Sequence, residues 1–328
     1  MKKLLLIILT ICLLITGCGK NSQRNVVNSI EKKYNKSNGY SLKGSLEITN
    51  NEEVYNYDVK SLYDKKNGFY KVVLTNKSND FSQVIIKNSD GVFLVTPSLN
   101  KSFKFNSDWP YNNSQIYLLD TLIKDINNDN NRTFDYRDGK YIFNTKVNYS
   151  SNSKLVKQKI VFDKNCSLKQ VVVYDNDDNI CMKLTVDKVD LSPKLKKSQF
   201  ELEDSYSTDN TKKTMGIDDV VYPLFLPSGT KLVDEKKIDK DNGQRVIMTY
   251  DGEKSFLLVE ETMDVFNDLT VIPSSGEPYQ LMDSIGVMTD KSLSWTSGGI
   301  EYYLVSDVMN SDELVEIAQS VVGITSVK

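Results

Sequence analysis

Cysteine and the carboxylates are the residues of this chain best able to do chemistry, because none of its 328 positions is histidine. This excludes catalytic sets that pair serine or cysteine with histidine, and zinc sites with histidine ligands. Two carboxyl groups about 5 to 9.5 Å apart can hydrolyse a glycosidic bond, and adjacent carboxylates occur at Asp177-Asp178, Asp218-Asp219 and Glu260-Glu261. Turn formation and solvation explain these pairs more simply, and neighbouring side chains of a strand point to opposite faces. We therefore expect no catalytic site.

Two further patterns could hold a metal ion or form a disulfide. The acidic stretch "DNDDN" at 175–179 has the composition of a calcium loop but lacks the glycine and the distant glutamate of that motif. We interpret it as a hairpin turn and expect no metal and no cofactor. Cys166 and Cys181 lie in turns at opposite ends of "LKQVVVYD". If that segment is a strand, the thiols are roughly 15–20 Å apart, too far for a disulfide, so both should be free.

The cysteine at position 18 ends an apolar segment. Lys2 and Lys3 precede an apolar run over residues 4–15, which is shorter than the ~20 residues of a membrane-spanning helix. A positive start, a short apolar core and small residues at its end are typical of a secretory signal. The simpler alternative is a buried thiol in a signal that is cut elsewhere.

The sequence Ile15-Thr16-Gly17-Cys18 resembles the lipobox of bacterial lipoproteins. In that class the thiol receives a diacylglyceryl group, and cleavage leaves the cysteine as the new N-terminus. The resemblance implies a signal peptide over residues 1–17 and a lipidated N-terminus over residues 18–23. Because two acyl chains such as palmitate hold stably in a bilayer, Cys18 is expected to anchor the chain at the extracytoplasmic face of the cell membrane.

The composition indicates a folded protein of two domains. Hydrophobic residues make up 39% of the chain and charged residues 26%, which is typical of globular proteins. The net charge is −3, with both signs interspersed. Nucleic acid is therefore not an expected partner, because it would require a concentrated basic face.

Alternation of apolar and polar residues dominates residues 40–190. In "YSLKGSLEI", Tyr40, Leu42, Leu46 and Ile48 share one side of a predicted strand, the pattern of a sheet with one solvated face. Similar segments separated by Asn, Gly, Asp and Pro give about 11 strands with short antiparallel connections. Hairpin turns are expected at Ser89-Asp90-Gly91 and at Asp138-Gly139. An amphipathic helix is expected before them and ends at Asn38-Gly39.

A second helix interrupts this series of strands. In "SDWPYNNSQIYLLDTLIKDI", Trp109 and Pro110 set the entry and Asn113 or Ser114 is the expected cap. Its apolar stripe consists of Ile116, Leu119, Leu122, Ile123 and Ile126. A large open sheet curls and needs a cover over its apolar concave face. The fold class is therefore mainly β (α+β), a curved antiparallel half-barrel of about 11 strands with covering helices.

The chain beyond the half-barrel forms a second unit. Residues 204–214 are polar, lack apolar periodicity and are interpreted as a linker. Hairpins are expected around Asp251-Gly252 and Gly298-Gly299, and a final helix capped by Ser311. Residues 215–328 are therefore predicted to be a small C-terminal α+β domain.

The order of elements over residues 24–203 resembles the LolA/LolB/RseB superfamily of envelope proteins. The stretch "VFLVTPSLNKSFKFNSDWPYNNSQIYLLDTLIKDI" is similar to the Gram-positive spore germination lipoproteins, the GerS-like branch. The resemblance implies a half-barrel with an apolar groove under helical lids. LolA carries lipoprotein acyl chains there, whereas GerS binds a cell-wall amidase. The candidate groove and lid residues are Leu42, Leu46, Ile48, Trp109, Ile116, Leu119, Leu122 and Ile123.

Two departures limit what the resemblance implies. LolA is a free shuttle, whereas Cys18 would tether this chain. LolA also closes its cavity with an arginine from an early strand, and no arginine lies between Tyr40 and Tyr63. We expect a non-catalytic, membrane-anchored envelope lipoprotein that binds a protein partner, such as an amidase or another cell-wall enzyme of spore formation or germination. The alternative is a carrier or sensor that binds lipid or acyl chains in the groove, although packing in the protein's own core explains each apolar residue more simply.

Overall fold

The computed structural model describes residues 22–50, 53–111, 113–149, 152–206, 217, 220–241, 243–281, 284–297 and 299–321. The predictions on Cys18, on the signal peptide over residues 1–17 and on most of the linker over residues 204–214 lie outside these ranges. Within them, no helix has the length and apolar character needed to cross a membrane.

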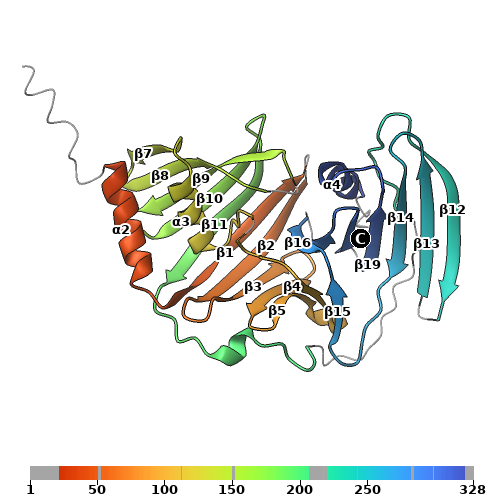
Figure 1. Ribbon diagram of the computed structural model, residues 1–328, viewed down its shortest axis with the longest axis horizontal. Coiled ribbons are helices and arrows are strands. Elements are labelled where there is room, and N and C mark those ends of the chain that lie inside the picture. Colours follow the sequence, from red (N-terminus) through yellow and green to blue (C-terminus); the bar gives the residue numbers. More distant parts are fainter. Residues whose placement is uncertain are drawn as a thin grey trace, which may run out of the picture.

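The first domain is built around one large curved sheet (Figure 1). Its strands run in two antiparallel meanders, β1 to β6 and β7 to β11, joined where β1 pairs with β11. The sheet is open, so the expected half-barrel is not a closed barrel. The strands are β1 (Gly39–Asn50), β2 (Glu53–Asp64), β3 (Phe69–Asn76), β4 (Ser82–Asn88), β5 (Gly91–Thr96), β6 (Lys101–Phe105), β7 (Thr133–Arg137), β8 (Lys140–Lys146), β9 (Leu155–Asp163), β10 (Leu168–Asp175) and β11 (Ile180–Asp190). Two short 3-10 helices, η1 (Pro97–Leu99) and η2 (Lys197–Phe200), complete the domain.

Two helices close the apolar side of this sheet. The first, α2 (Gln23–Asn35), lies at the end of the molecule opposite the second domain (Figure 1). The second, α3 (Leu119–Asn128), packs into the hollow side. The buried side chains of both helices join the sheet in one core cluster, because each helix presents an apolar stripe to an apolar face.

The predicted cap of the second helix is wrong. Leu118 occupies the N-cap position and makes no capping bond with its side chain. Ser114, one of the two expected caps, is used elsewhere. Its backbone N–H donates to the Asn148 carbonyl (2.7 Å), and its hydroxyl accepts the Asn148 N–H (3.0 Å). The segment before α3 is therefore tied to the strand region after β8 and cannot start the helix early.

A buried cluster of tyrosines fixes the start of α3. Asp120, in the first helical turn, accepts hydrogen bonds from the hydroxyls of Tyr40 (2.8 Å) and Tyr70 (2.6 Å). The Tyr40 hydroxyl also accepts the Leu119 N–H (3.1 Å). Tyr63 lies between these rings, with centroids 5.5 Å from Tyr40 and 4.4 Å from Tyr70. The carboxylate thus connects the helix to β1 and β3.

The second domain pairs a seven-stranded antiparallel sheet with one helix. Its elements are β12 (Lys231–Lys240), β13 (Gly243–Asp251), β14 (Phe256–Thr262), β15 (Thr270–Ser274), β16 (Glu277–Gln280), β17 (Ile285–Met288), β18 (Ser292–Ser297), β19 (Ile300–Val305) and α4 (Ser311–Ser320). All of these strands except β15 belong to the seven-stranded sheet, and α4 shares its core. The cap of α4 is Asn310, not Ser311 as predicted, and it forms a reciprocal capping box with Glu313.

Strand β15 crosses to the first domain and joins its sheet. It pairs in parallel with β6 and makes that sheet twelve-stranded. Asn100, at the start of the pairing, has φ +48° and donates through Nδ2 to the carbonyls of Phe266 (2.9 Å) and Asn267 (3.2 Å). The first domain supplies eleven strands, and the twelfth comes from the second domain to cover an otherwise unpaired edge.

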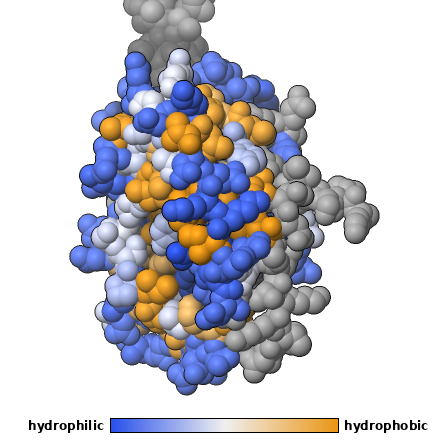
Figure 2. Space-filling view, turned by 90° about the vertical axis from the view of Figure 1, so that its right-hand side faces the viewer, coloured by the Kyte–Doolittle hydropathy of each residue, from blue (hydrophilic) through white to orange (hydrophobic). Residues whose placement is uncertain are grey.

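The opposite end of the molecule is formed by the edge strand β12 (Figure 1). Nine of its ten residues are exposed, and Val233 and Ile238 are 50% and 40% exposed. Figure 2 views this end and shows apolar groups separated by hydrophilic side chains. Unlike β15, strand β12 carries no proline, and its outer backbone edge is not paired within the described sheet.

Two local predictions can be checked against this fold. Asp138 and Gly139 turn between β7 and β8 with φ values of +53° and +70°, as a two-residue hairpin turn requires. Cys166 and Cys181 are both free. They lie beyond opposite ends of β10, where the strand separates them as predicted.

Candidate functional site

A cavity of about 970 Å³ lies where the two domains meet. One wall comes from the first domain: the ends of β1 and β11, the β10–β11 turn, the segment before α3, and the segment between β8 and β9. The other wall comes from the second domain: β16, the residues after it, and the end of α4. The lining includes Ile48, Gln115, Tyr117, Tyr149, Asn152, Lys154, Asp175, Asp178, Asn179, Ile180, Met182, Phe225, Pro278, Tyr279, Gln280, Glu316 and Ser320.

The charged side chains of this lining are already engaged. Lys154 pairs with Glu316 across the two domains (3.2 Å). Asp178 pairs with Lys157. Asp175 accepts the backbone N–H (2.8 Å) and the side-chain Nδ2 (2.9 Å) of Asn179, and these bonds lower its pKa. The acidic segment at 175–179 therefore forms the hairpin turn between β10 and β11, as predicted.

The neutral groups of the lining are less fully satisfied. The Tyr149 hydroxyl and the Gln280 Oε1 are buried and have no hydrogen-bond partner within the part of the chain that the structure describes. Burial raises the pKa of Tyr149 well above its ordinary value, so its hydroxyl stays protonated. Each unpartnered polar atom costs about 1–3 kcal/mol. An occupant of the cavity could recover this energy.

Seven of the eight predicted groove and lid residues do not line this cavity. Ile48 lines it, whereas the other seven candidates are buried in the core cluster of the first domain. Leu42, Leu46 and Leu122 are 0% exposed. Side chains of α3 therefore fill the hollow of the sheet, and the open space lies at its end, against the second domain.

Sequence reasoning did not identify the wall residues Tyr149, Tyr279 and Gln280. They lie in a loop and in a four-residue strand, where no periodicity marks a binding face. The composition of "GEPYQL" is the one local signal, because a proline-containing strand is usually an edge strand.

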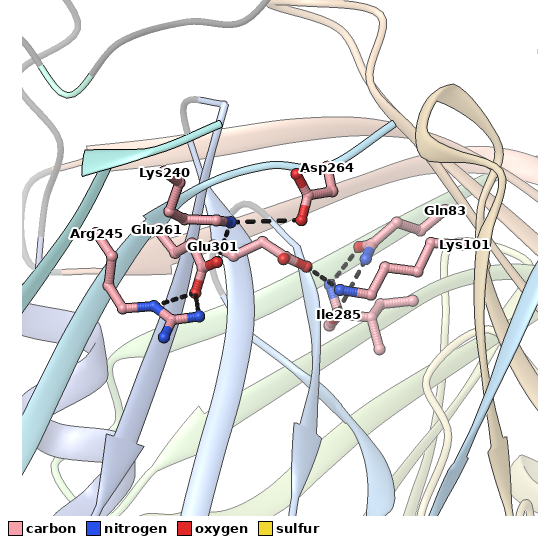
Figure 3. A network of polar contacts seen from close by, with 8 residues as sticks. All are labelled: Gln83, Lys101, Lys240, Arg245, Glu261, Asp264, Ile285 and Glu301. Atoms are coloured by element: carbon pink, nitrogen blue, oxygen red, sulfur yellow. Dashed lines mark hydrogen bonds and ion pairs between the residues drawn. The ribbon is translucent and has the colours of Figure 1, made fainter. Parts of the chain in front are cut away.

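Further polar contacts hold the domains together, and one of their residues, Ile285, also lines the cavity (Figure 3). Gln83 on β4 donates to the Ile285 carbonyl (3.0 Å) and accepts the Ile285 N–H (2.5 Å). Lys101 on β6 pairs with Glu301 on β19. Because the Gln83 pair is buried and the Lys101–Glu301 pair is largely so, the relative position of the domains is well specified.

The carboxylate pairs do not form a two-carboxylate site. Glu261 pairs with Lys240 and Arg245, on the same side as the interdomain contacts (Figure 3), while Glu260 faces the interior and is 0% exposed. Asp218 and Asp219 lie outside the described residues. No group of three or more acidic or cysteine side chains in the described ranges could hold a metal ion.

Glu260 makes the stability of the second domain depend on pH. Its Oε1 accepts the Val221 N–H (2.8 Å) and its Oε2 has no partner among the described residues. Burial raises its pKa to about 7. Because this lies above the unfolded value of about 4.5, stability should fall as pH rises through 7. Glu260→Gln should remove that loss and raise the free energy of unfolding by about 2 kcal/mol at pH 8. This is less than the full value of about 1.36 kcal/mol per pKa unit, because solvent screens part of the effect. Urea unfolding at pH 5 and pH 8 measures it.

Its neighbour supplies a control of opposite sign. Burial alone would raise the pKa of Glu261, but hydrogen bonds from Lys240 and Arg245 lower it. Glu261→Gln should therefore lose stability at pH 8, whereas Glu260→Gln gains it. Equal pH dependence in wild type and Glu260→Gln would contradict the assignment.

The fold is an open, curved antiparallel half-barrel with covering helices and an added C-terminal sheet, the architecture that the order of elements predicted. The chain belongs to the family of the Bacillus subtilis sporulation protein YdcC, to which it is 37% identical over 329 residues, covering 98% of this chain and 97% of that protein. No protein-family model matches the chain.

Two solved structures match the chain at low sequence identity. The Pseudomonas aeruginosa MucA/MucB complex matches at 10% identity with a TM-score of 0.31, covering 91% of this chain and 96% of that chain. A LolA superfamily protein from Nitrosomonas europaea matches at 9% identity with a TM-score of 0.31, covering 55% of this chain and 97% of that chain.

Proposed function

We propose that this chain is a membrane-anchored, non-catalytic envelope lipoprotein that acts in spore formation by binding a partner protein, most simply a cell-wall enzyme. The observation that carries the proposal is the 37% sequence identity, over 98% of this chain, to a sporulation protein. The lipobox at Cys18 supports a location on the extracytoplasmic face of the membrane. The absence of histidine and the separate environments of Glu260 and Glu261 support a binding role rather than catalysis.

The partner surface best supported by the fold is β12. A ten-residue edge strand whose outer edge is unpaired within the described ranges can accept a strand from another protein. Its seven charged residues limit indiscriminate pairing, and the exposed Val233 and Ile238 offer apolar anchors. A proline, by contrast, interrupts the edge strand β16 of the same sheet.

Crosslinking in sporulating cells tests this proposal. A tagged chain should capture an envelope enzyme, identified by mass spectrometry. Ile238→Asp should reduce capture several-fold without unfolding the protein, because the side chain is already exposed. Val54→Asp is the matched control, since Val54 is 51% exposed on the first domain. Recovery of lipid with no protein would favour the carrier alternative, and equal capture by Ile238→Asp would exclude β12.

The second candidate is ligand binding. The filled hollow of the half-barrel offers no space for acyl chains among the core residues, so the cavity at its end is the better place for a ligand. The mixed polar and apolar lining of that cavity is the observation that favours this candidate.

A further inference from the structure

We infer that the cavity between the two domains binds a neutral oligosaccharide carrying N-acetyl groups, the chemistry of cell-wall glycan strands. Whether the chain meets such a ligand in the cell depends on its proposed location on the extracytoplasmic face of the membrane. The recognition chemistry itself follows from the residues that line the cavity.

The charged groups of the wall are paired or hydrogen-bonded. The partners of the Lys154–Glu316 and Lys157–Asp178 pairs neutralise each other's charges, whereas Asp175 keeps its charge and accepts hydrogen bonds from Asn179. An anionic ligand would have to break these pairs or remain without a counter-charge, and either costs free energy. The lining therefore disfavours an anion and suits a neutral ligand.

Neutral polar groups form another part of the wall. The wall is rich in carboxamides, among them Gln115, Asn152 and Gln280, which both donate and accept hydrogen bonds. They suit a ligand with many hydroxyl and amide groups. A bare acyl chain would bury them without partners, at a cost for each.

Aromatic residues form part of both walls. Tyr117, Tyr149, Tyr279 and Phe225 contribute rings from both domains. Aromatic faces provide broad apolar contact area, which suits the C–H faces of sugar rings. Phe225 is 41% exposed although it lines the cavity, so a ligand can reach it from solvent.

Two buried oxygens of the wall have no hydrogen-bond partner among the described residues. The Tyr149 hydroxyl needs an acceptor and the Gln280 Oε1 needs a donor. An amide group supplies both, through its carbonyl and its N–H. Neither side chain is fully buried as a whole, so small rotations can present these atoms to a ligand.

A peptide is a less suitable source of amides. Peptides in such sites commonly extend a sheet by pairing with an edge strand. The edge strand at this cavity is β16, and Pro278 in its four residues has no N–H to donate. The observations therefore favour N-acetyl groups on a sugar over peptide bonds of a protein.

The domain contacts leave a route for entry. On the cavity side the domains meet through the Lys154–Glu316 pair, whose side chains are 59% and 39% exposed, and through Ser153, which donates to Asp312 (2.8 and 2.5 Å). Deeper in the interface, the contacts between Gln83 and Ile285 are buried, and Ile285 also lines the cavity. β15 is paired with β6 along all five of its residues. Opening at the exposed contacts is the less costly motion.

Calorimetry tests the inference with the mature chain, carrying Cys18→Ser for solubility. The probe is the tetramer of N-acetylglucosamine, with the deacetylated glucosamine tetramer and a capped neutral peptide as comparison ligands. The acetylated tetramer should bind at millimolar or lower concentration. Tyr149→Phe should weaken it about threefold to tenfold by removing one hydrogen bond. Thermal stability should not fall, because that hydroxyl has no partner among the described residues. Phe225→Ala should weaken it similarly.

Matched variants complete the design. Tyr136→Phe and Leu224→Ala alter exposed residues outside the lining and should leave binding unchanged. The inference would be overturned if the acetylated tetramer did not bind at millimolar concentration, or if the deacetylated tetramer bound equally well. It would also be overturned if only the peptide bound, or if Tyr149→Phe and Phe225→Ala both kept wild-type affinity. Partner capture in cells is a separate readout, so failure of either proposal is recognised independently.

Discussion

Replacing Asp120 with alanine should destabilise the first domain by about 3 kcal/mol, the largest effect we expect from a single substitution in the described core. The carboxylate accepts hydrogen bonds from Tyr40 and Tyr70, both of which are 0% exposed. Burial and the neighbouring carboxylate raise the pKa of both tyrosines well above the ordinary value, so the hydroxyls remain donors. Alanine leaves them buried without this acceptor, and hydrogen bonds to a charged group contribute about 1.5–3 kcal/mol each.

The measurement is urea unfolding of the mature chain carrying Cys18→Ser, followed by tyrosine and tryptophan fluorescence. Asp120→Asn keeps the shape and one acceptor oxygen, so it should lose less than Asp120→Ala. Asp90→Ala, in the exposed turn between β4 and β5, should stay within about 0.5 kcal/mol of the parent. A loss below about 1 kcal/mol for Asp120→Ala would show that the tyrosine cluster does not hold α3 in place.

Replacing Cys18 with serine should release the protein from the membrane almost completely. Each buried methylene contributes about 0.8 kcal/mol, so loss of two acyl chains removes far more binding energy than surface contacts could supply. A serine hydroxyl is a much poorer nucleophile than a thiolate. Fatty-acid labelling should disappear, and fractionation should find the protein in the medium.

Cys181→Ser is the matched control, because Cys181 is a free thiol within the folded domain. Burial raises the pKa of Cys181, which keeps its thiol unreactive. That variant should keep full labelling and membrane association. Unchanged labelling of Cys18→Ser would refute the lipid anchor and remove the main support for an envelope location.

The predictions that held depended on short-range patterns. The period-2 alternation in "YSLKGSLEI" predicted which side of β1 is buried, because each side chain points opposite to its neighbour. The stripe of Leu119, Leu122 and Ile123 predicted a helix packed on the sheet, and these residues are buried there. The helix caps were less predictable. Ser114 could have capped α3, but its bonds to Asn148, 34 positions away, could not be anticipated locally.

By itself the sequence determined the strand count of the first domain, the position of its covering helix, the turns and the free thiols, because each depends on neighbours along the chain. Tertiary structure alone decided that β15 completes the first sheet, that Glu260 is buried while Glu261 is paired, and that Tyr149 and Gln280 line one cavity. The β15 pairing and the cavity join residues separated by about a hundred positions or more. The contacts of Glu260 and Glu261 join segments of the second domain that only its folding brings together. Their free energy comes from burial and pairing that exist only after the domains have packed.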